Sequence, residues 1–241
     1  MEMLIKQIKD NKMGLSVAVE KMRSKILDLA IHGMLVPQDP NDEPAIELLK
    51  RINPKFTPCD NAHYPFDVPN NWEWTNLGEI TNYGNCENVD VNDIPKEGWV
   101  LELEDLEKDS AKIIQRHSKD ERDIKGVRHA FHKGDVLYSK LRTYLNKVMV
   151  APEDGFCTTE IIPVTCMPFI QPEYLNHVLR SKYFVDYTIQ CGYGVKMPRL
   201  STTDARNGQI PLPPHNEQQR IVAKIEELFA VLDEIQKFIE A

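Results

Sequence analysis

The stretch from Pro211 to the C-terminus constrains the fold more than any other part of the sequence. Pro211-Leu212-Pro213-Pro214 forbids helix, and Asn216 then stands as an N-cap with Gln219 in the capping-box position. Apolar residues follow at spacings of four, three, four, three and four: Ile221, Ile225, Leu228, Leu232, Ile235 and Ile239. This seam favours a helix that packs along a partner helix. The alternative is an amphipathic helix that lies on its own domain.

A second helical region is predicted at the N-terminus, from about residue 3 to residue 32. Its seam consists of Leu15, Val19, Met22, Ile26 and Leu29. The segment 11–14 weakens the preceding helix, and Gly33 is a plausible C-terminal stop. We also predict a short helix over 44–52. The N-terminal helical region therefore covers residues 1–52, and the proline-rich segment 53–71 is predicted to be a linker.

Between these regions, residues 72–211 have the pattern of short strands separated by turns. β-branched and aromatic residues gather in four predicted strands, 99–103, 136–139, 147–150 and 161–165. A helix is predicted between Pro172 and Tyr187. The fold class is α+β, a strand-rich mixed domain with long coiled-coil-type helices at both ends, the last one over 212–241.

Charge is distributed unevenly along the chain. The net charge is −8, but residues 107–147 hold eleven Lys and Arg against six Asp and Glu, a local charge of +5. The rest of the chain therefore carries −13. A basic segment on an acidic body fits a protein that touches a polyanion on one side, and a solvated lysine-rich loop is the alternative.

Several functional classes lack their signatures. The five cysteines form no Cys-x-x-Cys pair, so neither a disulfide framework nor a zinc site is expected, and His129 and His132 are expected to be structural. We find no P-loop, no Gly-x-Gly-x-x-Gly after a strand, no Gly-x-Ser-x-Gly and no Glu-x-Lys. No apolar run is long enough for a membrane span, and no signal-peptide core is present. The sequence thus favours a cytoplasmic binding protein without a catalytic residue, metal or cofactor.

Three stretches resemble the specificity subunits of type I restriction-modification systems. The first is the run from Lys25 to Gln38, which includes Ala30-Ile31-His32-Gly33. The second contains Gly134-Asp135-Val136-Leu137-Tyr138-Ser139-Lys140-Leu141-Arg142 and then Tyr144-Leu145-Asn146-Lys147. The third is Pro211-Leu212-Pro213-Pro214 followed by Glu217-Gln218-Gln219-Arg220-Ile221-Val222. Trp72-Glu73-Trp74 before Leu77-Gly78 resembles the usual start of their recognition domain.

Two features depart from that family. Thr143 stands where proline usually follows the arginine, which predicts a looser turn. The chain also has one recognition domain and one terminal spacer helix, where a complete subunit has two of each. The resemblance therefore implies either a naturally half-sized subunit or a truncated product, and for a half-sized subunit the other half would be supplied by a second copy in a homodimer. A helix over 216–241 is about 39 Å long, close to one turn of B-DNA at ~34–36 Å, and could set the spacing of a palindromic split target.

The resemblance implies double-stranded DNA, a methyltransferase subunit and a restriction subunit as partners. Arg and Lys read guanine, and many further contacts go to phosphate. Our candidate DNA-binding residues in the motifs are Lys140, Arg142, Tyr144, Lys147, Thr158, Thr159, Lys196 and Arg199. Those in the basic segment are Lys112, Arg116, Lys119, Arg122, Lys125 and Arg128.

Structural roles are the alternatives for these residues. Tyr144 could belong to the core, Arg142 could pair with Glu160, and the basic segment could be a solvated loop. Two other classes of protein also stay open: a coiled-coil structural or regulatory protein that reads no DNA, and an enzyme with an unfamiliar site.

Overall fold

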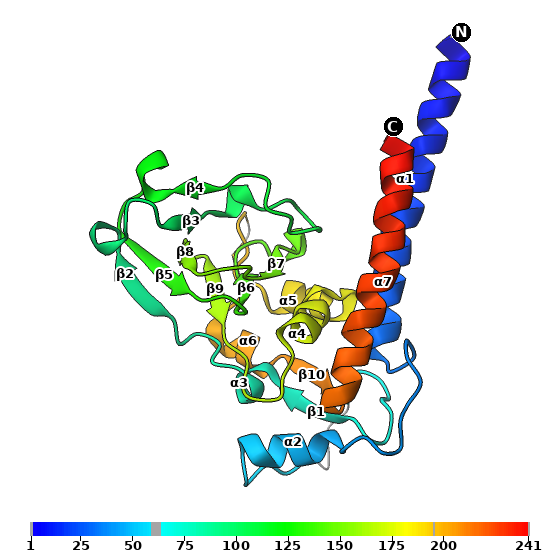
Figure 1. The fold of residues 1–241 in the computed structure, drawn as a ribbon, viewed down its shortest axis with the longest axis vertical. Coiled ribbons are helices and arrows are strands. Elements are labelled where there is room, and N and C mark those ends of the chain that lie inside the picture. The colour runs from blue at the N-terminus through cyan, green and yellow to red at the C-terminus, as the bar shows by residue number, and fades with distance from the viewer. Residues whose placement is uncertain (1, 59–63, 195, 241) are drawn as a thin grey trace.

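Two long antiparallel helices form one side of the molecule, and a strand-rich unit lies to the other side (Figure 1). The computed structural model describes residues 2–58, 64–194 and 196–240. Helix α1 spans Glu2–Ile31 and helix α7 spans His215–Glu240. The N-terminal end of α1 projects beyond the C-terminal end of α7 (Figure 1). This arrangement confirms the predicted α+β class with helices at both ends.

Helix α1 ends as its sequence predicts but is continuous where a weak point is expected. Gly33 has φ +68°, and the Met34 N–H donates to the Leu29 carbonyl over 2.9 Å, which closes the last turn. No break occurs at 11–14, because a single glycine costs a long helix only about 1 kcal/mol. Polar bonds link α1 to α7: Arg23 Nη2 lies 2.7 Å from Asp233 Oδ1, and Ser16 Oγ lies 3.1 Å from Gln236 Nε2.

The predicted seam of α1 is only partly covered by α7. Val19 is 3% exposed, whereas Leu15 and Met22 are 56% and 53% exposed. One helix covers one face, and α7 contacts the face that carries Val19 and Arg23. The apolar stripe predicted from the sequence is wider than that face, so its remainder stays open to solvent.

Helix α7 begins two residues earlier than the sequence suggests. The Pro214 carbonyl accepts the Gln218 N–H over 2.9 Å, so Pro214 occupies the N-cap position and Asn216 already lies inside the helix. The Asn216 amide faces Asp42 instead, at 3.3 Å. The predicted capping box between Asn216 and Gln219 is therefore wrong, because the helix starts at His215 rather than after Asn216.

A two-stranded antiparallel sheet closes the strand-rich unit at its base. Strand β1 (Glu73–Asn76) pairs with β10 (Gln209–Leu212) in the register Trp74 to Pro211. The pairing brings the start and the end of the unit together beside α7. Three short helices lie around it: α2 (Ala45–Ile52), α3 (Leu77–Ile80) and α6 (Thr202–Asn207).

A three-stranded sheet forms the centre of the larger core. Strand β6 (Val136–Ser139) lies between β7 (Val148–Val150) and β9 (Ile161–Val164), both antiparallel to it. Helices α4 (Pro172–Arg180) and α5 (Lys182–Cys191) belong to the same core. A single helix was expected here. Ser181 divides it, because its hydroxyl donates to the Val178 carbonyl at 2.6 Å and accepts the Phe184 N–H at 3.3 Å.

A five-stranded sheet extends away from the helical pair and holds a second, smaller core. Its order is β2-β5-β8-β3-β4. The strands are β2 (Glu87–Asp90), β5 (Val127–Phe131), β8 (Gly155–Cys157), β3 (Trp99–Leu101) and β4 (His117–Ser118). Four short 3-10 helices punctuate the loops: η1 (Val91–Asp93), η2 (Leu103–Asp105), η3 (Lys119–Glu121) and η4 (Thr143–Leu145). Leu137 and Ile161 reach from the central sheet into this second core.

The remaining sequence expectations concern cysteine, histidine and membrane segments. Four cysteines are free thiols, and Cys59 lies outside the described residues. His129 is buried with Nδ1 3.0 Å from the Ile161 carbonyl, and burial lowers its pKa. In the described part of the chain, no group of three His, Cys, Asp or Glu side chains is placed to hold a metal ion. No helix in that part is both long and apolar enough to cross a bilayer.

Candidate nucleic-acid interface

Three segments that lie far apart in the sequence meet beside the end of β6. They are 140–147, which follows β6, 158–160, which precedes β9, and 193–199, which follows α5. The Lys140 N–H donates to the Glu160 carbonyl over 3.0 Å, and the Arg142 N–H donates to the Pro198 carbonyl over 2.7 Å. Leu141 and Arg199 form an antiparallel bridge. The fold thus brings together all three segments chosen from the sequence motifs.

Arg142 holds a strained backbone conformation at the centre of this cluster. Its φ of 51° lies in the left-handed region that favours glycine, and its Nε atom is buried without a hydrogen-bond partner among the described residues. Such strain and unpaired polar atoms gather at binding sites. The following turn η4 is closed, because the Leu145 N–H reaches the Arg142 carbonyl over 2.8 Å. The looser turn expected from Thr143 is not present.

Arg199, not Arg142, pairs with Glu160. Arg199 Nε lies 3.1 Å from both Glu160 oxygens, and Nη2 lies 2.9 Å from Oε1. This hydrogen bonding to Glu160 raises the pKa of the Arg199 guanidinium. The sequence-based alternative that paired Arg142 with Glu160 is therefore wrong. The bridge between Leu141 and Arg199 places Arg199 against Glu160, whereas the left-handed backbone at Arg142 directs the Arg142 N–H to the Pro198 carbonyl.

The other motif residues differ in how accessible they are. Tyr144 is 44% exposed and is not a core residue. Lys196 is exposed, and Thr158 and Thr159 are half-buried. Lys147 is used within the fold, because its Nζ donates to the Leu103 carbonyl over 2.7 Å and burial lowers its pKa. Lys147 is therefore not available to a phosphate in this conformation.

The basic segment between 112 and 128 is not a uniform charged loop. Arg122 Nη2 lies 2.5 Å from the buried Asp105 carboxylate, and Arg128 Nη2 lies 3.0 Å from Glu102. Both guanidinium side chains are only 12% exposed. They hold the five-stranded sheet together, so they are not free to contact DNA.

Four other members of the segment have four different environments. Arg116 pairs with Glu153 and stacks on the Trp99 ring, with its guanidinium carbon 4.9 Å from the ring centroid. Lys119 donates to the Ile94 carbonyl over 3.3 Å. Lys112 Nζ lies 3.9 Å from Asp233 on α7. Lys125 is exposed, and its carbonyl accepts a hydrogen bond from Arg128 Nη1 over 3.0 Å, but its ammonium group has no ion pair or hydrogen bond with the described residues.

The predicted seam residues of α7 divide along the helix. Ile221, Ile225 and Leu232 are buried, and Leu228 and Ile239 are partly exposed. Ile235 is 41% exposed, and the neighbouring Val231 and Phe238 are 53% and 86% exposed. The first half of α7 belongs to the core of the chain, while its second half retains an open apolar face.

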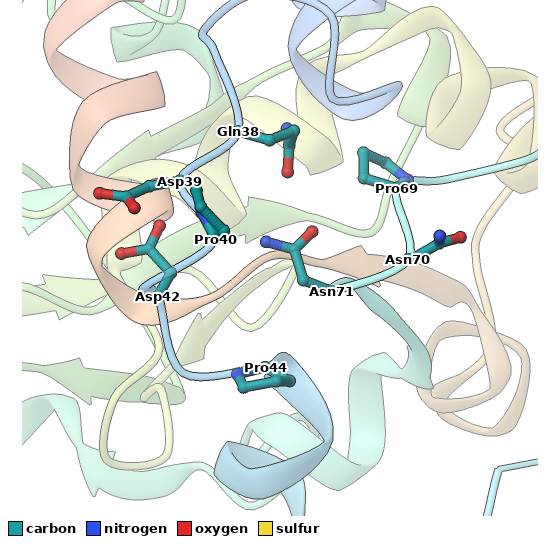
Figure 2. A pocket seen from close by; sticks show the side chains of 8 residues that line it. All are labelled: Gln38, Asp39, Pro40, Asp42, Pro44, Pro69, Asn70 and Asn71. Atoms are coloured by element: carbon teal, nitrogen blue, oxygen red, sulfur yellow. The ribbon is translucent and has the colours of Figure 1, made fainter.

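A hollow of about 340 Å³ lies at the base of the helical pair, between the segments 38–44 and 69–71 (Figure 2). Its carboxylates are already engaged: Asp42 Oδ2 lies 2.6 Å from Arg220, and the backbone N–H of Asn41 donates to Asp39. The Asn41 hydrogen bonds lower the pKa of Asp39, so this carboxylate stays charged. An acidic hollow repels a polyanion, which leaves the cluster around Arg142 as the candidate interface.

Sequence reasoning missed two exposed side chains of this cluster, Tyr193 and Met197, at 58% and 48% exposure. The segment Gly192-Tyr193-Gly194 begins a turn that the sequence analysis did not predict. Glu160 was named only as a partner of Arg142. The signal that could have found the turn is Pro198 after a Gly-x-Gly segment.

Comparison with known proteins identifies the family that residues 69–241 match. The profile of the family described as "Type I restriction modification DNA specificity domain" matches residues 69–241. The EcoAI specificity subunit of Escherichia coli is 29% identical over 91% of this chain and 41% of its own length. The EcoDI specificity subunit of the same organism is 25% identical over 98% of this chain and 53% of its own length. The chain thus spans about half the length of these relatives.

A solved structure is similar as well. The crystal structure of the HsdS subunit from Thermoanaerobacter tengcongensis superposes with a TM-score of 0.61 at 26% identity. The match covers 72% of this chain and 46% of that one.

Proposed function

Because the chain belongs to the family of type I restriction-modification DNA specificity domains, we propose that it reads one half of a split DNA target for a type I complex. The reading unit would be residues 72–211, after a helical region 1–52 and a linker 53–71, with the spacer helix in 212–241. The role is recognition without catalysis. The site of action would be the cytoplasm.

The convergence of the three motif segments carries this proposal. Lys140, Arg142 and Lys196 come from two of these segments and gather at one end of the unit, although 56 residues separate the first from the last in the sequence. Arg and Lys donate to guanine edges and to phosphate, so such a cluster suits the major groove of double-stranded DNA. Tyr144, Thr158 and Thr159 would add hydrogen bonds, and Lys125 a phosphate contact.

A second copy of the chain would supply the other half of the target. The helical pair leaves apolar side chains uncovered on both helices: Met13, Leu15, Val17 and Met22 on α1, and Val231, Ile235 and Phe238 on α7. Val231, Ile235 and Phe238 share one face of α7, and neighbouring exposed apolar side chains of this kind commonly mark an interaction surface. The chain spans about half of its relatives, so a two-fold dimer through this face of α7 would restore two reading units. It predicts a palindromic, interrupted target.

A methyltransferase subunit and a restriction subunit would complete the assembly. The relatives are specificity subunits of restriction enzymes, and a specificity subunit needs partners that modify and cut the DNA it selects. These subunits would bind the helical pair and the flank of the reading unit, opposite the basic cluster.

Methylation mapping tests the proposed function. We would co-express the chain with the methyltransferase subunit of its own genome and locate modified adenines in host DNA. The expected result is one interrupted palindromic motif that is lost in Arg142→Ala. A stable complex that methylates no defined motif would contradict DNA reading and favour a coiled-coil structural role.

Dimerisation is tested on the exposed face. Deleting 216–241 would remove Ile221 and Ile225 from the core and unfold the chain, so a surface substitution is the sharper test. Phe238→Glu is expected to give monomers in sedimentation and to abolish methylation. Lys237→Glu places the same side chain at the adjacent exposed position and should leave a dimer. A monomeric wild-type chain in an active complex would refute the homodimer.

A further inference from the structure

A narrow turn over 193–199, of which all but residue 195 is described, presents apolar side chains beside Arg142. The Tyr193 N–H donates to the Arg199 carbonyl over 3.0 Å, and the Arg199 N–H donates back over 2.9 Å. Gly194 has φ +96°, which lets the chain reverse. Met197 is 48% exposed and Tyr193 is 58% exposed. Two large apolar groups in solvent at a cationic site are not explained by packing.

The base of this turn is held firmly. Arg199 is fixed by its bidentate pair with Glu160, and the Leu200 N–H donates to the Lys140 carbonyl over 2.9 Å. The Pro198 carbonyl accepts the Arg142 N–H. Because the base of the turn is tied, less ordering of its described residues is needed when a ligand binds. Arg199 is therefore a positioning residue, and its charge is already neutralised by Glu160.

The chemistry of the tip defines what it can read. The surrounding cations Lys140, Arg142 and Lys196 favour nucleic acid, as the proposed function requires. A methionine thioether has no donor for a guanine or adenine edge. The apolar group that the major groove presents is the C5-methyl of thymine. A flexible, polarisable side chain adapts well to such a small apolar target.

We propose that Met197, flanked by Tyr193, contacts a thymine C5-methyl group and so selects thymine at one position of the half-site. This inference rests on the proposed function, because it places the turn 193–199 in the major groove. It also separates three roles in one segment. Met197 contacts a base, Lys196 binds the DNA backbone, and Arg199 positions both side chains.

Replacement of thymine by uracil tests the contact, since uracil lacks only the methyl group. The methyltransferase complex of the full chain would be titrated with its mapped target, each thymine replaced in turn. One uracil is expected to weaken wild-type binding about fourfold, which corresponds to ~0.8 kcal/mol for one buried methyl group. Met197→Ala should show the same loss with thymine and no further loss with uracil.

Matched variants keep the test specific. Lys196→Ala should weaken binding to all sequences and retain the fourfold effect of uracil. Arg199→Lys keeps the charge but loses the bidentate pair, so the uracil effect should shrink while the salt dependence stays unchanged. Sequence-specific binding with no uracil effect at any position, or an effect that Met197→Ala retains, would overturn the contact and leave the proposed function standing. Absence of sequence-specific binding would overturn both.

Discussion

The pair formed by Arg122 and Asp105 offers the clearest test of how the basic segment is used. The Asp105 side chain is fully buried, with one oxygen 2.5 Å from Arg122 Nη2 and the other accepting the Glu102 N–H over 2.7 Å. Arg122→Met would remove the guanidinium and leave a buried carboxylate with one remaining donor. Breaking a buried pair in this way costs about 3–5 kcal/mol. We expect the lower end, because the Glu102 N–H bond survives.

A loss of about 3 kcal/mol corresponds to a change of roughly a hundredfold in the unfolding equilibrium. In a chain of this size it should lower Tm by about 6–12 °C. Urea unfolding followed by tryptophan fluorescence would measure the loss of stability, because Trp99 lies in the smaller core beside the five-stranded sheet. Lys125→Ala, at an exposed position of the same segment, should stay within about 0.5 kcal/mol of the wild type.

A second substitution separates the lost ion pair from lost packing. Asp105→Asn in the Arg122→Met background removes the unpaired charge and keeps an acceptor for the Glu102 N–H, so more than half of the stability should return. The salt dependence of DNA binding should not change in Arg122→Met. A stability loss under about 1 kcal/mol, no recovery in the double variant, or a salt slope reduced by about one would refute the structural role of Arg122.

Three further predictions follow from other parts of the molecule. Lys140→Ala and Lys196→Ala should each reduce the slope of log affinity against log salt by about one, measured by a fluorescence titration with target DNA; unchanged slopes would remove these residues from the interface. Gly33→Ala should lower the free energy of unfolding by at least about 1–2 kcal/mol, because φ is +68° and the added Cβ would lie 2.4 Å from Pro69 Cγ. Gly14→Ala, at an open position inside helix α1, should raise the free energy of unfolding by about 0.5–1 kcal/mol, and thermal unfolding measures both changes. Burial raises the pKa of Glu217 above its ordinary 4.5, so the folded state favours the protonated acid. The stability of the wild type should therefore fall, relative to that of Glu217→Gln, as the pH rises from 4.5 through the pKa of the folded state. Parallel urea titrations over a pH series would reveal this difference, and a constant difference across the series would contradict it.

The segment after α1 and the start of α7 are joined by partly buried polar contacts. Gln38 Nε2 donates to Glu217 Oε1 over 2.6 Å, and Arg220 pairs with Asp42 at 2.6 Å. Residues from the segment after α1 thus hold the first turn of α7. The two motifs identified separately in the sequence form one structural joint, which orients the helical pair against the strand-rich unit.

The sequence by itself determined those features that depend on neighbouring residues. The strand Val136–Ser139, the stop at Gly33 and the existence of the long C-terminal helix, though not its first residue, follow from local apolar periodicity and from turn residues, which act over a few positions. The motif segments around Lys140 and Lys196 were chosen as candidate DNA contacts from the sequence, and the fold brings them together. Each carries its signal in consecutive residues.

Tertiary structure alone decided which charges are free and which apolar faces are covered. Arg122 and Asp105 stand 17 residues apart, and Arg199 and Glu160 stand 39 apart, so no spacing rule relates them. Their pairing follows from strand order, which brings distant carboxylates within hydrogen-bonding distance of particular guanidinium groups. The same holds for the seam of α1, because the direction from which α7 packs selects Val19 for burial and leaves Met22 in solvent. An amphipathic pattern shows that a helix has an apolar face, but the arrangement of its neighbours determines how much of that face becomes core.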